Sequence, residues 1–513
     1  MTGAAVTRNP AVDGGPTTGT PAARAPRPGL GMVVVMTGVL ITAVDTTIVV
    51  LALPVIQRDL HVSLSSVIWV VTGYLLVITV LATQVGRLGD MFGRVRMYEA
   101  GFVVFVLGSL LCALAWNEGS IIGFRALQAV GGAFVVANSG AVIADLYPPE
   151  QRGRAFGFNA VGWTLGAVLG VLLGGVMVTY FSWRWIFWIN VPIGLGALAL
   201  ALRVLHDKGE RVSRRLDPAG MITLGLGLYG VLWAMTKLAT APLDATQVGY
   251  LAGGLFMLAV FVVIELRHST PMLDLSLFKV PTMAPSLLAS AFQGLASYAV
   301  LFLVIMYLQG ARGLTPIHAS LLLVPGYVLS LAVGPFAGRL ADKFGPVLPA
   351  TAGLALQVVS LVIFAQLTED SGLWIVVVGS VVNSIGASFF FPANSAAVMK
   401  ASPPAMLGIS SGVLRTFGSI GMVFSFTTAI LIASHSISRS LAFAIFVGTT
   451  TLHGHLAGAF TTGLHAAFYT MTAFMVIAAI LSALRGRPGG AGRSGRAEAG
   501  AGAGGADAAS RAA

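Results

Sequence analysis

Cysteine and charge are both scarce in this chain of 513 residues. The single cysteine, Cys112, excludes an intramolecular disulfide bond and a CxxC metal site. Only 10% of the residues are charged, whereas 56% are hydrophobic and the mean hydropathy is +0.87. These values exceed what the core of a soluble protein holds, so they predict a protein with many membrane-spanning segments.

Acidic residues are scarcer than basic ones, with 19 Asp and Glu against 30 Lys and Arg, which gives a formal net charge of +11. A nucleic-acid-binding protein gathers its cations on one accessible face, but here the cations lie between apolar runs. We therefore expect no nucleic-acid partner. The terminal segments, 1–28 and 486–513, are rich in Gly, Ala and other small residues, which is typical of disordered tails.

Apolar runs of the length that crosses a hydrocarbon layer of ~30 Å occur fourteen times along the chain. The first begins after Pro28 and contains Asp45, so it is interpreted as a spanning helix and not as a cleaved signal peptide. The predicted spans are 31–55, 65–85, 98–116, 120–145, 155–179, 185–204, 219–238, 247–266, 282–309, 317–337, 347–367, 374–398, 408–433 and 464–484.

The distribution of Lys and Arg indicates how these spans are oriented. With the N-terminus in the cytoplasm, two cations lie within helices, at Arg125 and Arg415, and all but five of the others fall on the cytoplasmic side. The positive-inside rule favours this orientation, with both termini cytoplasmic. The five cations on the outer side are Arg58, Arg184, Lys237, Arg312 and Arg439.

A charged, glycine-rich segment occurs twice. Residues 86–94 read GRLGDMFGR and residues 338–345 read GRLADKFG, each between two apolar runs. This repeat predicts two related membrane-embedded halves. The second copy follows the tenth run and not the eighth, so two helices are inserted between the halves, in a six-plus-two-plus-six arrangement. The predicted divisions are a tail (1–30), a six-helix bundle (31–204), a basic linker with two inserted helices (205–281), a second six-helix bundle (282–485) and a tail (486–513).

The repeated segments are interpreted as inner loops that control conformational switching. Their glycines permit tight turns and close helix approach, and Asp90 and Asp342 are placed to accept hydrogen bonds from helix N-terminal amides or a neighbouring arginine. A solvated turn is the simpler alternative for either copy. The predicted switching residues of the two loops are Gly86, Asp90, Gly93, Arg94, Gly338, Asp342 and Gly345.

Asp45 is the one carboxylate predicted at mid-membrane depth, where an ionisable group costs roughly 2.5–3.5 kcal/mol. Burial favours its neutral form, so Asp45 is predicted to gain and lose a proton. Arg125 is its natural ionic partner, with Gln128 on the same helix face. The alternatives are a structural hydrogen bond for Asp45 and an Arg125 side chain that extends to the outer headgroups.

Glycines recur at every fourth position in the predicted span 155–179, at Gly162, Gly166, Gly170 and Gly174. Such a stripe lets another helix approach closely. Gly166, Gly170 and Gly174 are predicted to take part in conformational switching, with generic close packing as the alternative.

Six short motifs occur in order along the chain. They are DTTIVVLALP (45–54), Trp69 with Tyr74 and Leu75, RALQAVGG (125–132), WRWIFWINVPIG (183–194), Glu265 with PMLDL (271–275) and Phe278, and YLQ (307–309). Together they resemble one family, the fourteen-helix drug:proton antiporter branch of the major facilitator superfamily (EmrB/QacA type), and the resemblance covers residues 31–485. Val50 and Val171 stand where the branch usually has Asn and Pro, and the second departure keeps symport open as an alternative to antiport.

The resemblance implies an all-α membrane fold whose first, fourth, ninth and twelfth helices line a central cavity, and it associates Arg125 with proton movement. A pocket of aromatic and amide side chains with one buried acid suits an amphipathic organic molecule, neutral or singly cationic. Packing against lipid or a neighbouring helix is the alternative for each lining residue. The predicted substrate-binding residues are Thr47, Gln128, Gln293, Tyr298, Asn383, Phe390 and Asn394.

We therefore expect a monomeric exporter in the bacterial cytoplasmic membrane that moves lipophilic compounds by alternating access. It would use the proton gradient and no cofactor. A narrow exporter of one metabolite, lipid or siderophore, or a symporter of the same fold, is the alternative. A membrane enzyme would need a catalytic constellation, and none is found. His453 and His455, in the predicted outer segment 434–463, are spaced unsuitably for a helical metal pair.

Overall fold

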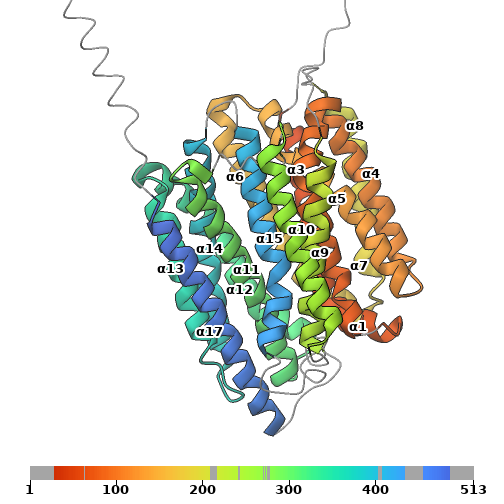
Figure 1. Cartoon of the computed structure of the whole chain (residues 1–513), viewed down its shortest axis with the longest axis vertical. Helices are drawn as coiled ribbons and strands as arrows, with labels where there is room; N and C mark the ends of the chain where they lie inside the picture. The colour runs from red at the N-terminus through yellow and green to blue at the C-terminus, as the bar shows by residue number, and fades with distance from the viewer. Residues whose placement is uncertain are drawn as a thin grey trace, which may run out of the picture.

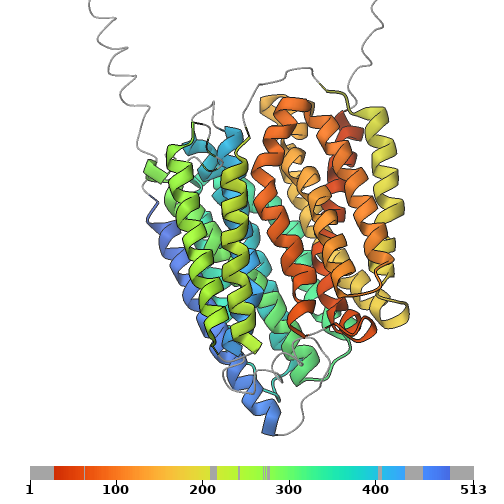
Figure 2. The same ribbon diagram turned by 45° about the vertical axis from the view of Figure 1, so that its right-hand side comes forward.

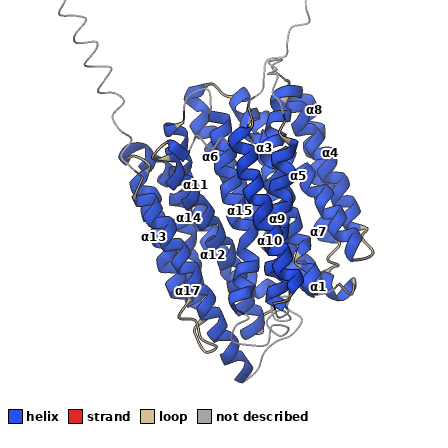
Figure 3. Cartoon of the chain, viewed as in Figure 1, coloured by secondary structure: helices blue, strands red, loops and turns tan. Residues whose placement is uncertain are grey.

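The computed structural model describes residues 28–485, apart from 63, 208–215, 241–242, 270, 272, 274–277, 403–406 and 434–454. The described residues form helices joined by loops, with no strand among them (Figure 3). Twelve of these helices are long and apolar enough to cross a membrane, or 13 if the bent helix α3 counts as one span. The predicted fold of apolar helices is confirmed, whereas the count of fourteen stays a prediction.

Each predicted span has a helix at its position, with ends that shift by a few residues. The first part of the chain contains α1 (Pro28–Asp59), α2 (Leu64–Val67), α3 (Trp69–Phe92), α4 (Arg94–Ala113), α5 (Glu118–Leu146), α6 (Pro149–Tyr180), α7 (Trp185–Trp188) and α8 (Asn190–Val204). Then follow α9 (Pro218–Thr240) and α10 (Ala245–Arg267). The last part contains α11 (Met283–Met306), the π-helix η2 (Tyr307–Ala311), α12 (Pro316–Phe344), α13 (Val347–Phe364), α14 (Leu373–Ala401), α15 (Leu407–Ala433) and α17 (His455–Ala483).

The helices pack in two groups with matching neighbours. In the first group α1 packs against α6, α4 against α5, and α3 against α5; in the second, α11 packs against α15, α13 against α14, and α12 against α14. The groups meet where α6 lies against α12 and α3 against α15. Figure 1 shows α4, α5, α7 and α8 toward one side of the bundle and α13, α14 and α17 toward the other, with α6 and α15 between them. This pairing is what the sequence repeat predicts.

Helices α9 and α10, at the positions predicted for the two inserted helices, form a close pair on the outside of the bundle. Their backbones approach closely at Gly230 and Gly254. A Cβ atom on Gly230 would lie 2.9 Å from Cα of Gly254, so only glycine fits at this position. Helix α9 packs against both α3 and α15, so it bridges the two groups. Figure 2 shows the pair in the foreground, in yellow-green and green, beside the junction.

The start of α1 and the finish of α17 lie at the same end of the bundle, which we call the terminal end (Figure 1). Both repeated segments also lie there, but they are mostly helical, so the prediction of loops is wrong. Gly86, Gly89 and Asp90 belong to the last turns of α3, and Gly338 to α12. The helices continue past their apolar runs because the polar residues of the last turns form the same backbone hydrogen bonds there.

The breaks fall at the last glycine of each copy, Gly93 with φ 111° and Gly345 with φ 81°. Replacing Gly93 by alanine is expected to lower the stability of the folded protein by about 1–3 kcal/mol, because L-residues rarely adopt this backbone conformation. A Cβ atom there would also press on the Asp207 carboxylate. The measurement is thermal unfolding in detergent.

Gly86→Ala is the matched control, since a Cβ atom on Gly86 meets nothing within 4 Å and the residue lies inside a helix. It should leave stability unchanged or raise it by roughly 0.5–1 kcal/mol. Equal losses in both variants would contradict a special role for the backbone at Gly93.

The outer segment predicted at 434–463 is partly helical, because α17 begins at His455. The prediction of a start at 464 is therefore wrong by about two turns. His453 and the predicted outer cation Arg439 lie outside the described residues, as do residues 1–27 and 486–513 of the predicted tails. The N-terminal tail predicted to extend to residue 30 ends earlier, because α1 begins at Pro28.

Candidate functional site

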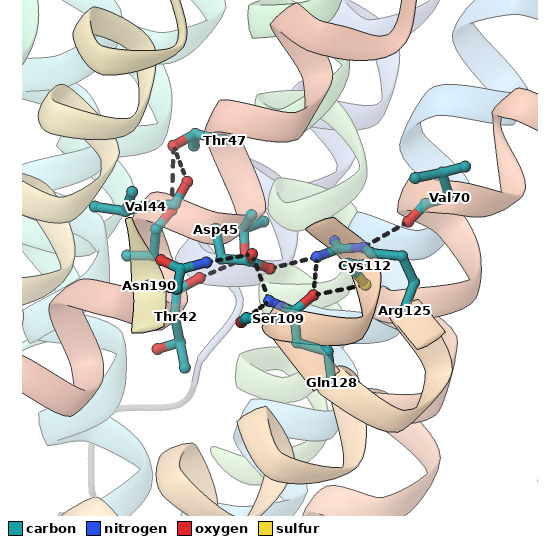
Figure 4. Close-up of polar contacts among 12 residues, drawn as sticks. Thr42, Val44, Asp45, Thr47, Val70, Ser109, Cys112, Arg125, Gln128 and Asn190 are labelled. Atoms are coloured by element: carbon teal, nitrogen blue, oxygen red, sulfur yellow. Dashed lines mark hydrogen bonds and ion pairs between the residues drawn. The ribbon is translucent and has the colours of Figure 1, made fainter. Parts of the chain in front are cut away.

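Asp45 lies near the middle of α1, fully buried, and three side chains donate hydrogen bonds to it. Its Oδ2 atom accepts from Nη1 of Arg125 at 2.6 Å, and this contact is also an ion pair. Its Oδ1 atom accepts from Nε2 of Gln128 at 2.8 Å and from Nδ2 of Asn190 at 3.1 Å. Figure 4 shows the three donors, from α5 and α8, converging on this carboxylate. The predicted pairing of Asp45 with Arg125 is present.

Arg125 is only 1% exposed, so its side chain does not reach the headgroup region as the alternative proposed. Its Nε atom donates to the carbonyl of Val70 at 3.0 Å, and its Nη1 atom also donates to Oε1 of Gln128 at 2.6 Å. The guanidinium lies 4.0 Å from the ring centroid of Tyr74, in cation–π contact. These contacts offset the large desolvation cost of burying the arginine.

Gln128 belongs to this network, and its predicted substrate-binding role stays a prediction. It is fully buried, and its Nε2 atom donates to Ser109 at 2.7 Å as well as to Asp45. Its Oε1 atom accepts from Arg125 and lies 3.7 Å from the sulfur of Cys112. Every polar atom of this amide is therefore engaged.

Local features of α4 and α5 position these side chains. Asn117 caps α5 by accepting from the backbone N–H of Ser120 at 2.8 Å, which fixes where the helix begins and so where Arg125 and Gln128 point. A Cβ atom on Gly108 would lie 2.5 Å from Cα of Gln128, so only glycine permits this approach of α4. The close approach brings Ser109 and Cys112 against the amide.

Asn190 is the first residue of α8, and only Ile189, which itself has helical backbone angles, separates it from Trp188 at the end of α7, so the two helices form one span from Trp185 to Val204. The preceding segment is held at the opposite end from the terminal end. There Nε1 of Trp183 donates to Asp59 at 2.8 Å and Arg184 pairs with it at 2.7 Å. The hydrogen bond from Trp183, followed by that from Arg184, lowers the pKa of the Asp59 carboxyl from its ordinary value.

Asn190, Ser109 and Tyr74 are members of the site that sequence reasoning did not assign. Asn190 and Tyr74 fall within recognised motifs, and each is a polar group in an otherwise apolar run, which is the signal that could have indicated them. Their partners lie far away in the sequence, so only the packing of α5 and α8 against α1, and of α3 and α4 against α5, identifies the contacts.

The hydrogen-bond pattern suits one charge state of the site. Three N–H donors point at Asp45, one of them from a guanidinium, and this arrangement matches an ionised carboxylate.

The glycine stripe of α6 packs directly against α1. A Cβ atom on Gly166 would lie 2.7 Å from the Leu40 carbonyl, one on Gly170 would lie 2.8 Å from the Val44 carbonyl, and one on Gly174 would press on Ile48. The close approach predicted from the spacing is therefore present, with α1 as the partner. Thr47, a predicted substrate-binding residue, faces this stripe and donates to the carbonyls of Ala43 and Val44.

A neighbouring glycine, Gly175, touches the second group of helices. A Cβ atom there would lie 3.2 Å from Cα of Ile317 and 3.1 Å from Oγ of Ser320, both in α12. Both positions lie toward the end opposite the terminal end, so α6 and α12 are in close contact at that end.

The repeat residues of the first half form a charged cluster at the terminal end. Arg94 pairs with Asp90 at 2.9 Å and with Asp145 of α5 at 2.9 Å, so Asp90 has the arginine partner that was expected. The backbone N–H at the start of α4 is taken instead by Asp207, which accepts from Val95 at 2.9 Å. The side chain of Asp342, in the second copy, lies outside the described residues.

The predicted cavity residues of the second half are only partly brought together. Gln293 of α11 is fully buried, and its Nε2 atom donates to Ser297 at 2.8 Å and to Gln357 at 3.3 Å. Ser297 donates to the same Gln357 oxygen at 2.7 Å. Gln357, on α13, was not predicted because that helix was not expected to line the cavity.

The other predicted lining residues are dispersed. Asn394 is buried and donates to the carbonyl of Ser286 at 3.4 Å, and Tyr298 and Asn383 are half-buried. Phe390 is fully buried in the apolar core, so it does not line a cavity in this conformation, and its neighbour Phe391 is the exposed aromatic. Phe390 is directed inward because α13 and α14 approach closely here.

A bundle of long apolar helices in two matching groups, with an ion pair buried at mid-span, defines a multi-pass membrane protein of the transporter type. A family model described as Major Facilitator Superfamily matches residues 35–292 and 286–507. The chain belongs to this superfamily of membrane transporters.

Three similar proteins carry names that describe transport or export. The tetracenomycin C resistance and export protein of Streptomyces glaucescens is 30% identical over 77% of this chain and 74% of its own length. The multidrug efflux pump LfrA of Mycolicibacterium smegmatis is 29% identical over 78% of this chain and 80% of its own. The riboflavin transporter RibZ of Clostridioides difficile is 29% identical over 76% and 84%.

Solved structures support the same fold. A bacterial homologue of the human lysosomal transporter Spinster, in an inward-facing and unoccupied conformation, has a TM-score of 0.59. The comparison covers 90% of this chain and 98% of that one at 17% identity, which is evidence for the fold alone.

Proposed function

We propose that this protein is a proton-driven exporter of lipophilic or amphipathic organic compounds, in the fourteen-helix branch of its superfamily. The observation that carries the proposal is the Asp45–Arg125 pair, 2.6 Å apart and buried at the middle of the bundle. A static fold gains little from such a pair, because its desolvation cost is large. A titratable carboxylate there is suited to proton coupling.

The proposed cycle follows from the hydrogen bonds of Asp45. In the conformation described, three donors favour the ionised carboxylate. When the helices separate on the outer side, Asp45 takes a proton, and the return movement delivers that proton to the cytoplasm. Inward proton flow contributes about 2.3 kcal/mol per 100 mV, in addition to the pH difference.

The membrane, orientation and substrate are parts of the same proposal. We place the protein in the bacterial cytoplasmic membrane, as a monomer without a cofactor, with the terminal end in the cytoplasm. Two relatives named for drug or antibiotic export favour a lipophilic substrate. The buried amides Gln293 and Gln357 offer polar contacts in an apolar surrounding, which suits a neutral or singly cationic amphipathic molecule.

Inverted membrane vesicles test this function directly. Respiration-energised vesicles that contain the protein are expected to accumulate lipophilic fluorescent compounds, and a protonophore should abolish the accumulation, because the proton gradient supplies the energy. Vesicles from the same cells without the protein are the control. Accumulation that persists after the gradient is collapsed would contradict proton coupling.

A transporter with a narrow specificity for one metabolite is the second candidate. It is favoured by the similarity to the riboflavin transporter RibZ. Val171, which stands where the branch usually has proline, keeps symport open as its mode of transport. A panel of chemically diverse compounds in cells that lack other pumps separates the two candidates. Resistance to several unrelated compounds supports the exporter of broad specificity.

A further inference from the structure

A second group of buried carboxylates lies at the terminal end, away from Asp45. Asp217 immediately precedes α9 and Glu265 lies in the last turn of α10, and their exposed fractions are 0% and 3%. Both residues belong to the inserted helix pair. Neither residue has a part in the proposed cycle.

One oxygen of each carboxyl group has a backbone partner. Oδ1 of Asp217 accepts from the N–H of Gly220 at 2.8 Å, which caps α9. Oε2 of Glu265 accepts from the N–H of Leu273 at 2.8 Å. These bonds fix the orientation of both groups and direct their remaining oxygens toward a common point.

The remaining oxygens, Oδ2 of Asp217 and Oε1 of Glu265, converge over Gly220. Both lie within 2.7 Å of the position that a Cβ atom on Gly220 would occupy. Both are buried, and neither has a hydrogen-bond donor among the described residues. Two ionised carboxylates in this position would repel each other with no donor between them, whereas one shared proton turns one oxygen into a donor and satisfies both.

Among the residues that the structure describes, the charged and polar groups nearest the pair come from α3. Arg87 is 7% exposed and its charge acts on Glu265, while it donates to the carbonyl of Pro271. Gln84 accepts from the backbone N–H of Asp217 at 3.4 Å, and its own Nε2 atom has no partner among the described residues. Helix α15, which also packs on α9, contains one charged residue, Arg415.

We propose that Asp217 and Glu265 form a second proton-binding site, in which one proton is shared between the two carboxyl groups. With that proton the pair carries a single negative charge, which Arg87 balances; without it the buried cluster has an excess negative charge. The proton comes from water at the terminal end. Loss of this proton leaves two carboxylate anions that repel each other. Their repulsion weakens the packing of the inserted helix pair against α3.

The contact of this site with α3 connects the site with conformational change. Gln84 and Arg87 flank Gly86, the first residue of the repeated segment, so the pair touches α3 where its charged last turns begin. The proton occupancy of the pair therefore acts on the helix that packs against α15 across the junction of the two groups. This inference concerns the inserted pair, and it does not depend on the direction or the substrate of transport.

Infrared titration of the full-length protein in lipid nanodiscs tests the site without a transport assay. The wild type is expected to show the C=O band of a protonated carboxyl group that disappears as the pH is raised. Glu265→Gln and Asp217→Asn should each lack this band, because an amide supplies the donor permanently while retaining the backbone contact. Asp244→Asn, which keeps the cap of α10 at the other end of the same helix pair, should retain it.

Thermal unfolding over the same pH range provides the second measurement. The shared proton stabilises the folded state, so the wild type should lose stability as rising pH removes that proton, whereas Glu265→Gln should not. A band that persists unchanged in both variants would overturn the proposal. So would equal pH dependence of unfolding in the wild type and in Glu265→Gln. If one variant fails to fold, the other and the wild-type titration still decide the question.

Discussion

Replacing Asp45 by asparagine is expected to abolish proton-driven accumulation in inverted vesicles, because an amide at this position cannot take up or release a proton. The variant also leaves Arg125 buried without a counter-charge. Breaking such a pair from one side costs about 3–5 kcal/mol, so the unfolding temperature should fall as well. Uptake of a fluorescent substrate and thermal unfolding in detergent measure the two effects separately.

A double variant separates the coupling role from the structural role. Asp45→Asn combined with Arg125→Gln removes both charges, so much of the lost stability should return, in the way that coupled neighbours depart from additivity. Transport should remain absent, because the titratable group is still missing. If the Asp45→Asn single variant kept wild-type proton-driven uptake, the pair would have a structural role only.

Replacing Gly166 by leucine is expected to separate α6 from α1 and to eliminate transport. Even a Cβ atom at this position would lie 2.7 Å from the Leu40 carbonyl and 2.7 Å from Cβ of Ala43. The carbonyl belongs to the backbone, so rotating a side chain cannot relieve the contact. Forcing extra atoms into a packed interface typically costs about 1–3 kcal/mol, and a leucine here should lie at the upper end.

Gly196→Leu is the matched control for this substitution. Gly196 also lies within a helix, α8, but it is exposed and a Cβ atom on it meets nothing within 4 Å. Its leucine variant should keep wild-type transport and stability. Gly166→Ala should give an intermediate loss of transport and stability. A Gly166→Leu variant that keeps wild-type transport and stability would show that α1 and α6 can pack without the stripe.

The sequence predicted the helices well because each must present about 20 apolar residues to lipid, and that requirement is local. The sequence did not predict where the helices end. Gly86 to Asp90 look like a loop because they are polar and rich in glycine, yet α3 continues through them as far as Phe92. A helix can extend beyond the hydrocarbon layer at no cost to its backbone hydrogen bonds, so the end of hydrophobicity does not mark the end of the helix.

The site was predictable to the extent that charge in an apolar run is rare. Asp45 and Arg125 could be recognised individually, and their pairing followed from the scarcity of partners. Asn190 and Gln357 could not be assigned in the same way, because an uncharged amide in a membrane helix has many possible neighbours. The Asp217–Glu265 pair was missed for another reason: both residues lie at helix ends, where a carboxylate usually reaches water.

The one cysteine of the chain is useful to an experimenter. Cys112 is fully buried beside the amide of Gln128, so the native protein offers no thiol on its described surface. Single cysteines can therefore be introduced on α6 and α12 and labelled without first preparing a cysteine-free background. Distances between two such labels, at the end where Gly175 meets Ile317, would record directly how far the halves separate during a transport cycle.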